Sequence, residues 1–141
     1  MNTQISSDYG AFVLRIASGV LFIAHGLMKV LIFTVPGTIA FFESLGVPGY
    51  FAYLTLFAEL VGGTALILGV STRLVSVAVM PVLIGATWTH SSNGWSFTNT
   101  VGGWEFPLFW TFVQASLILI GGGAFRLRLP ILQKALGPQF A

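Results

Sequence analysis

The residues of this sequence that could do chemistry are few, and most of them interrupt long apolar stretches. His25 and Lys29 lie in the first stretch, Glu59 lies in the second, and His90 and Glu105 stand at the ends of the third and fourth. A carboxylate in an apolar interior needs a partner, and a carboxylate beside an imidazole can move protons or hydrogen-bond a ligand. We therefore predict His25 and Glu59 as catalytic residues, and Lys29, His90 and Glu105 as binding residues.

Helical periodicity predicts that these residues meet. At about 100° per residue, six residues of the first helix, most of them polar or small, share one arc of about 120°. The second helix carries Glu59 on a face of small residues, which permits close helix packing. At a rise of about 1.5 Å per residue, His25 and Glu59 have similar depths, and Lys29 lies one turn farther out. We hypothesise a cluster of Glu59, His25 and Lys29, completed by His90 and Glu105. The face of the first helix is Arg15, Gly19, Phe22, His25, Gly26 and Lys29, the opposite, lipid-facing side is Val13, Val20, Ala24 and Leu27, and the face of the second helix is Ala52, Thr55, Glu59, Gly62, Gly63 and Gly69.

Each of these residues also has a purely structural interpretation. The partners of Glu59 can form an ion pair that only fixes the helix register, His90 can cap a helix or contact water, and Glu105 can interact with a helix dipole. Gln114 is expected to make a helix contact. No pair of residues has the His-x-x-x-His or Glu-x-x-His spacing of a helical metal site, so we predict no metal site.

Composition indicates an integral membrane protein. The chain has 141 residues, of which 55% are hydrophobic and 7% charged, whereas a soluble domain carries about 25% charged residues. The six Lys and Arg residues are scattered, so no nucleic-acid surface is expected. Because the chain has no cysteine, it offers no thiol chemistry of its own.

The apolar stretches predict an all-α fold, an integral membrane four-helix bundle that forms a single domain over residues 1–141. The predicted spans are about 12–33, 50–70, 74–90 and 106–124, each near the roughly 20 residues that cross a bilayer. Residues 38–45 are expected to form a short interfacial helix, and the glycines at 121–123 a helix terminus.

The basic residues predict the orientation. Arg73 lies in the second connection and Arg126, Arg128 and Lys134 lie in the tail, whereas the two other connections have no basic residue. The positive-inside rule then puts both termini in the cytoplasm, in a multi-pass protein of the inner (plasma) membrane. Arg73 and Arg15 are predicted anchors, and Arg15 is placed so that it could reach cytoplasmic lipid phosphates.

A recognisable order of short motifs runs along nearly the whole chain: Leu14-Arg15-Ile16, His25-Gly26, Lys29, Phe41-Phe42, Leu45-Gly46-Val47-Pro48, Ala58-Glu59-Leu60-Val61-Gly62-Gly63, Leu68-Gly69, Thr72-Arg73, His90, Asn93-Gly94-Trp95, Asn99 and Gly103-Trp104-Glu105-Phe106-Pro107. This order resembles the DoxX family of bacterial and archaeal membrane proteins. The resemblance implies a four-helix membrane bundle and an association with electron transfer, since the family is named after the small subunit of an archaeal thiosulfate:quinone oxidoreductase. The chain departs from the family after Gly121, where an ending similar to Ser-Leu-Asp is common and this chain has Phe125-Arg126-Leu127-Arg128.

The function that we favour on this basis is a small subunit of a quinone-linked membrane oxidoreductase complex. A quinone would bind at the polar cluster between aromatic walls from Trp88, Trp95, Trp104 and Phe106, with Trp104 as a further binding residue. Since the sequence carries no electron-transfer cofactor motif, electrons must come from a redox partner protein, and enzymatic activity of the chain alone stays open. Alternatives are a small permease or lipid-phase ligand-binding protein, and a membrane scaffold or assembly factor for a redox partner; a homo-oligomer also remains open.

Overall fold

The computed structural model describes residues 3–137, so residues 1, 2 and 138–141 of the predicted domain lie outside the described part. Every regular element in the described part is helical, which confirms the all-α prediction. The elements are α1 (Thr3–Leu31), α2 (Val35–Ser44), α3 (Tyr50–Phe57), the π-helical turn η1 (Ala58–Gly62), α4 (Gly63–Leu68), α5 (Thr72–Thr89), the 3-10 turn η2 (Ser91–Asn93), α6 (Glu105–Ile120) and α7 (Pro130–Leu136).

Three helical segments of the described chain are long and apolar enough to cross a membrane. They are Thr3–Leu31, the continuous helix Tyr50–Leu68 formed by α3, η1 and α4, and Thr72–Asn93. Helix α6 is apolar but has 16 residues, fewer than the predicted span 106–124. It stops at Ile120 because Gly121 has φ +82° and ψ −164°, a conformation that glycine adopts readily and that a helix cannot continue through.

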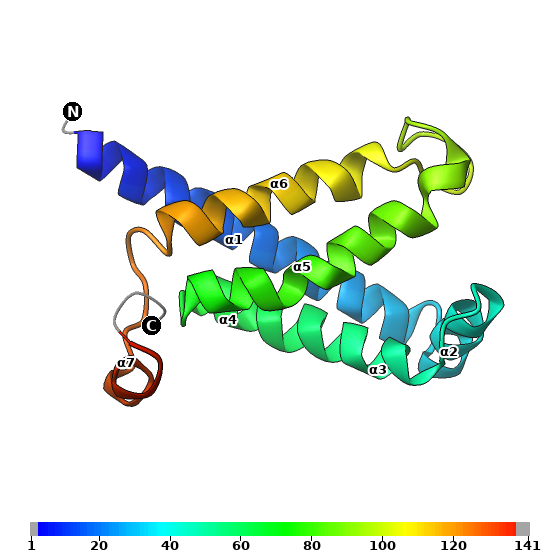
Figure 1. The fold of residues 1–141 in the computed structure, drawn as a ribbon, viewed down its shortest axis with the longest axis horizontal. Coiled ribbons are helices and arrows are strands. Elements are labelled where there is room, and N and C mark those ends of the chain that lie inside the picture. The colour runs from blue at the N-terminus through cyan, green and yellow to red at the C-terminus, as the bar shows by residue number, and fades with distance from the viewer. Residues whose placement is uncertain (1–2, 138–141) are drawn as a thin grey trace.

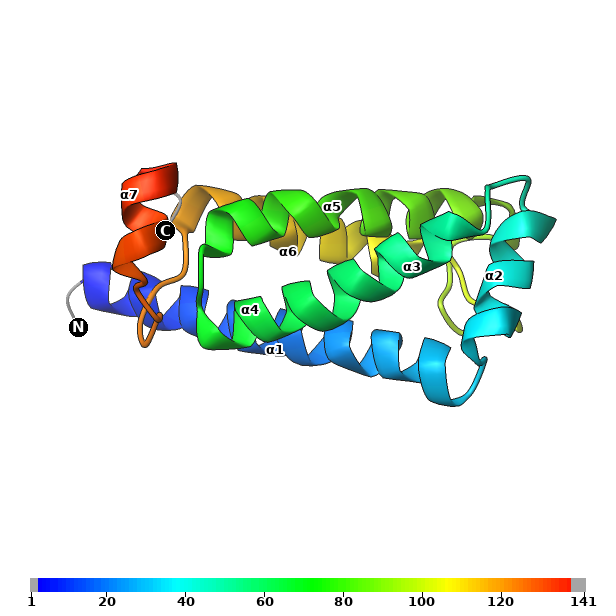
Figure 2. The ribbon, with the colours of Figure 1, turned by 90° about the horizontal axis from the view of Figure 1, so that it is seen from below.

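The long helices lie lengthwise beside one another, with α2 at one end of the molecule and α7 at the other (Figures 1 and 2). Helix α1 packs against α4, η1 and α6, and α5 packs against α6. The predicted short helix over residues 38–45 is present as α2, which begins three residues earlier than expected. The Thr34 hydroxyl, just before the helix, accepts from the Gly37 amide. The buried apolar core consists of Phe22, Leu66, Val79, Leu83 and Trp110.

The orientation of α1 about its own axis agrees with the predicted division of its surface into an inward face and a lipid-facing side. Val13, Val20 and Leu27 are exposed on the predicted lipid side, while Arg15 and Gly19 are buried. A Cβ atom on Gly19 would lie 2.7 Å from the carbonyl oxygen of Gly63, so glycine is required here for the two helices to approach this closely.

Candidate functional site

An ion pair joins α1 to the π-helical turn. The Nζ atom of Lys29 donates to Oε1 of Glu59 at 2.7 Å. Glu59 is buried, with 5% of its side chain exposed, and Lys29 is half-buried, with 20% of its side chain exposed. The structure therefore brings together two of the three residues at the centre of the predicted cluster.

Glu59 has an unused hydrogen-bonding atom. Its second carboxylate oxygen, Oε2, is buried and has no hydrogen-bond partner within the described residues. Glu59 also belongs to η1, the π-helical turn inside an otherwise α-helical segment, and such turns occur frequently at functional sites. The hydropathy pattern gave no signal for this turn, because a π-helical turn accommodates one extra residue and leaves the apolar composition of the helix unchanged.

His25 lies on the side of α1 that faces α6. Its Nδ1 atom is 2.8 Å from the carbonyl oxygen of Leu21, and since a carbonyl only accepts, Nδ1 carries the proton. The other ring nitrogen, Nε2, then has a lone pair when the ring is neutral. The imidazole contacts the indole of Trp110, with 5.3 Å between the ring centroids.

A second polar group lies deeper along the interface of α1 and α6. The Ser18 hydroxyl oxygen accepts from Nε1 of Trp110 and from Nε2 of Gln114. Gln114 is fully buried and its Oε1 atom has no partner among the described residues. The predicted helix contact of Gln114 is present, but Ser18 and Trp110 were not among the predicted site residues, since a lone serine and a lone tryptophan carry no spacing signal.

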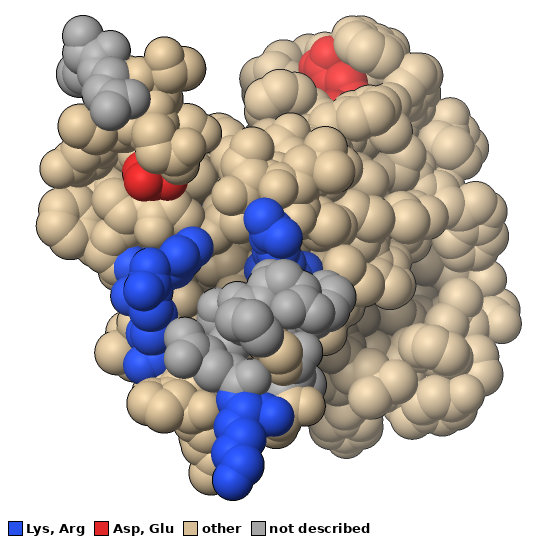
Figure 3. Space-filling model, turned by 60° about the vertical axis from the view of Figure 1, so that its left-hand side comes forward, with Lys and Arg blue, Asp and Glu red and all other residues tan. Residues whose placement is uncertain are grey.

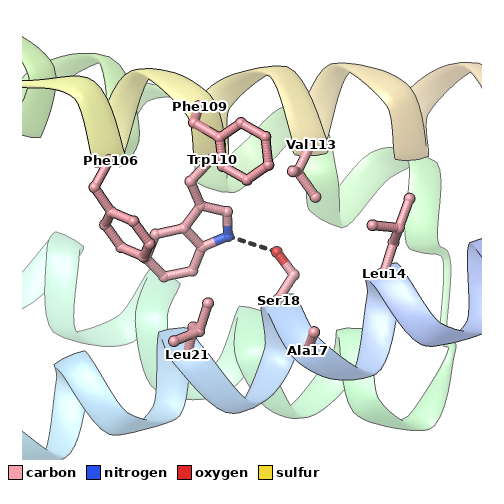
Figure 4. A pocket seen from close by; sticks show the side chains of 8 residues that line it. All are labelled: Leu14, Ala17, Ser18, Leu21, Phe106, Phe109, Trp110 and Val113. Atoms are coloured by element: carbon pink, nitrogen blue, oxygen red, sulfur yellow. Dashed lines mark hydrogen bonds between the residues drawn. The ribbon is translucent and has the colours of Figure 1, made fainter.

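An apolar crevice opens between α1 and α6 beside Trp110 (Figure 4). It has a volume of about 130 Å³. Its polar lining groups, the Ser18 hydroxyl and the indole N–H of Trp110, are hydrogen-bonded to each other, and Ser18 also accepts from Gln114. The lining residues are Leu14, Ala17, Ser18, Leu21, Phe106, Phe109, Trp110 and Val113.

The crevice leads toward His25. Leu21 and Phe106 lie at one end of it and Leu14 at the other (Figure 4). His25 follows Leu21 by four residues on α1, which is about one helical turn, and its ring contacts Trp110. The end of the crevice at Leu21 and Phe106 therefore lies next to the imidazole.

The structure does not bring His90 and Glu105 into this cluster through any described hydrogen bond. Nδ1 of His90 donates to the carbonyl oxygen of Ala86, and Oε1 of Glu105 accepts from the amide of Phe97 at 2.8 Å. Both residues therefore order the end of α5 and the loop 91–105, because each hydrogen-bonds to backbone near its own element.

Most of the predicted aromatic walls also belong to that loop region. Trp95 and Trp104 pack edge to face, with ring centroids 4.6 Å apart, and Trp88 is exposed. Of the four predicted wall residues, Phe106 lines the crevice, where its companions are Phe109 and Trp110. The loop aromatics pair with each other because the Glu105 and Trp104 amides fold the loop back onto Trp95 and Gly94.

Arg15, a predicted anchor, is held inside the protein. The residue is fully buried, and its guanidinium donates to the carbonyl oxygens of Leu66 and Ile67 at 2.6 Å. It also donates to the carbonyl oxygens of Gly122, Ala124 and Phe125. The guanidinium thus satisfies the free carbonyls at the end of α4 and in the segment after α6, instead of extending to phosphates.

The remaining basic residues gather at the end of the molecule that carries α7 (Figure 3). Arg126, Arg128 and Lys134 are exposed there. Arg73, at the beginning of α5, donates from Nη2 to the carbonyl oxygen of Leu119 at 3.1 Å, so this predicted anchor also fastens the end of α6.

Two known proteins are similar to this chain over part of its length. The chain is 40% identical to "Putative oxidoreductase CatD" of Bacillus subtilis (strain 168) over 84 residues, which cover 60% of this chain and 61% of the relative. It is 38% identical to "Inner membrane protein YqjF" of Escherichia coli (strain K12) over 66 residues, covering 47% of this chain and 49% of the relative. Each match therefore spans less than two thirds of the relative's length.

No solved structure matches the chain. The model of the DoxX family matches residues 10–92, a region that contains α1 from Gly10 onward, the π-helical turn and the Lys29–Glu59 ion pair. With three helices that are long and apolar enough to cross a membrane, this chain is a membrane protein that belongs to the DoxX family.

Proposed function

We propose that this protein is the small membrane subunit of a quinone-linked oxidoreductase complex, and that its quinone site lies at Glu59, Lys29 and His25. The observation that carries the proposal is the buried ion pair of Lys29 and Glu59, whose Oε2 atom has no partner. Charged groups inside membrane helices are costly and mark ligand or proton sites.

The residues around the pair fit a quinone. The head group would hydrogen-bond within the cluster of Glu59, Lys29 and His25, and the apolar crevice beside Trp110 offers room for part of its isoprenoid chain. When bound, a quinone supplies two-electron chemistry that is coupled to two protons. Glu59 and the Nε2 atom of His25 are the groups of this chain that could accept or return those protons, because each has a free lone pair.

The chain offers no route for electrons of its own, so we propose a redox partner protein as the electron donor. The name of the relative CatD, an oxidoreductase, supports a redox role. The exposed surface of the loop 91–105 and the basic end around α7 are available to such a partner. The mass of the purified protein would show whether the subunit also forms a homo-oligomer.

For the membrane we propose a single domain over residues 1–141 with four spans, both termini in the cytoplasm, in the plasma membrane. The three long apolar segments and the basic end around α7 support this topology. Helix α6 has 16 residues, which gives a length of about 24 Å. A span this short is accommodated by local thinning of the bilayer.

Binding of a prenylated quinone to the purified protein tests the function. Wild-type protein in nanodiscs should bind the quinone and unfold at a higher temperature in its presence. Glu59→Gln should weaken binding of the reduced form of this quinone at least about tenfold with little loss of expression, whereas Glu43→Gln, on α2, should leave it unchanged. If neither the oxidised nor the reduced ligand binds the wild type, the proposal is wrong.

A small permease or lipid-phase ligand-binding protein is the second candidate. The crevice between α1 and α6 favours it, because an apolar groove beside a polar cluster suits any amphipathic molecule that dissolves in the bilayer. Flux of such a molecule into proteoliposomes, lost in Glu59→Gln, would support this candidate over the redox subunit.

A further inference from the structure

The hydrogen-bonding atoms that remain free at Glu59 define the chemical form of the ligand. We infer that the site selects the hydroxyl-bearing, reduced form of a quinone head group, the hydroquinone, over the carbonyl-bearing oxidised form. This inference rests on the proposed function and goes one step further, since quinone binding alone predicts no preference.

The first step concerns Oε2 of Glu59. The Nζ atom of Lys29 occupies Oε1 at 2.7 Å, while Oε2 is buried and has no partner among the described residues. A buried acceptor that is left unpaired is costly, so a bound ligand gains most by donating a hydrogen bond to it.

The second step concerns the surroundings of Glu59. The neighbouring residue of α1 is Gly26, and a Cβ atom added there would lie 3.3 Å from Cβ of Glu59 and 2.7 Å from a methyl group of Leu60. Apart from the ammonium group of Lys29, which is bonded to Oε1, α1 therefore presents a glycine without a side-chain donor at this contact. No described side chain donates to Oε2, so we assign its donor to a ligand.

The third step concerns His25 and Lys29. The Nδ1 proton of His25 is used by the Leu21 carbonyl, so Nε2 of the neutral ring is a second acceptor. The ammonium group of Lys29 has three N–H groups, of which one is directed at Glu59. The site thus offers two acceptors and the remaining donors of one ammonium group.

These groups discriminate between the two redox forms. A hydroquinone hydroxyl can donate to Oε2 of Glu59 or Nε2 of His25 and can accept from Lys29 with the same oxygen. A quinone carbonyl can only accept, so it leaves Oε2 unpaired inside the protein. Sites built to hydrogen-bond a hydroxyl reject analogues that lack it, because their own buried groups are then left without partners.

The experiment compares three ligands with one hydrocarbon chain: the prenylated hydroquinone, its dimethyl ether and the corresponding quinone. Affinities are measured anaerobically by equilibrium titration of the full-length protein in nanodiscs. The hydroquinone should bind about tenfold more tightly than the quinone, which corresponds to about 1.4 kcal/mol. The dimethyl ether, which has an electron-rich ring but no hydroxyl donor, should bind no better than the quinone.

Glu59→Gln provides the second measurement, because its amide group can donate to a carbonyl. The preference for hydroquinone should vanish or reverse in this variant, and it should persist in Glu43→Gln. Equal affinities of the wild type for hydroquinone and quinone, or a tighter dimethyl ether, would overturn the inference and leave quinone binding intact. Absence of binding for all three ligands would instead overturn the proposed function, and the inference with it.

Discussion

Lys29 and Glu59 are separated by 30 positions in the chain, yet their charged groups lie 2.7 Å apart. The two partners are buried unequally, since 20% of the Lys29 side chain is exposed and 5% of the Glu59 side chain. An ammonium group that loses its partner can turn toward the surface, whereas the carboxylate cannot. The ion pair should therefore respond differently to the removal of each partner.

Lys29→Met should destabilise the protein more than Glu59→Met does. Loss of Lys29 leaves an uncompensated charge in the interior, which costs about 3–5 kcal/mol. The double variant should recover most of this loss, because replacing both partners of a buried pair by apolar residues is close to neutral. Thermal unfolding in detergent measures the three variants, and equal losses for the two single variants would contradict the unequal burial.

Arg15→Lys should loosen the segment that follows α6. Lysine cannot reach the five carbonyl oxygens that the guanidinium contacts, and each hydrogen bond that involves a charged group contributes about 1.5–3 kcal/mol. We expect a loss of at least about 3 kcal/mol and faster proteolysis near Arg126 and Arg128. Arg73→Lys, which loses one half-exposed hydrogen bond, is the matched control and should stay within about 1 kcal/mol of the wild type.

Gly19→Ala should separate α1 from α4. The added Cβ would lie 2.7 Å from the Gly63 carbonyl oxygen, and overpacking of this kind costs about 1–3 kcal/mol. Gly10→Ala, on the same helix with nothing within 4 Å of its Cβ, should instead stabilise by about 0.5–1 kcal/mol. A stable Gly19→Ala protein, measured by thermal unfolding, would show that the two helices can move apart at little cost.

Ala17→Phe should weaken the binding of a long-chain quinone about tenfold without affecting the same head group that lacks the chain. The new ring would fill the crevice lined by Ala17, Phe109 and Trp110. Ala24→Phe places the same ring on an exposed position of the same helix and should change neither affinity. Equal effects of the two variants in a titration would remove the crevice from the binding site.

Single cysteines test the topology, because the chain has none of its own. A membrane-impermeant thiol reagent should label Ser92→Cys in right-side-out vesicles, and Ser7→Cys and Arg128→Cys in inside-out vesicles. These positions are exposed in the structure. Labelling of Ser92→Cys and Arg128→Cys from the same side would mean that α6 does not cross the membrane.

The sequence alone determined the features that depend on local periodicity. Apolar length predicted where the long helices lie, and the 100° rotation per residue predicted that Glu59 is buried and that Val13, Val20 and Leu27 face outward. These properties hold for each helix by itself. The stop of α6 at Gly121 is local too, because it depends on a backbone conformation that favours glycine.

The tertiary structure decided which of these faces meet and what they enclose. The burial of Arg15 depends on the segment after α6 folding back onto α4, and the partners of Ser18 come from positions 92 and 96 residues away. His90 and Glu105 are bonded within their own region because the loop 91–105 folds onto itself. Such contacts depend on how helices and loops pack against each other in space, and helical periodicity does not specify this packing. Packing therefore decided that Lys29 and Glu59 meet while one carboxylate oxygen of Glu59 has no partner among the described residues.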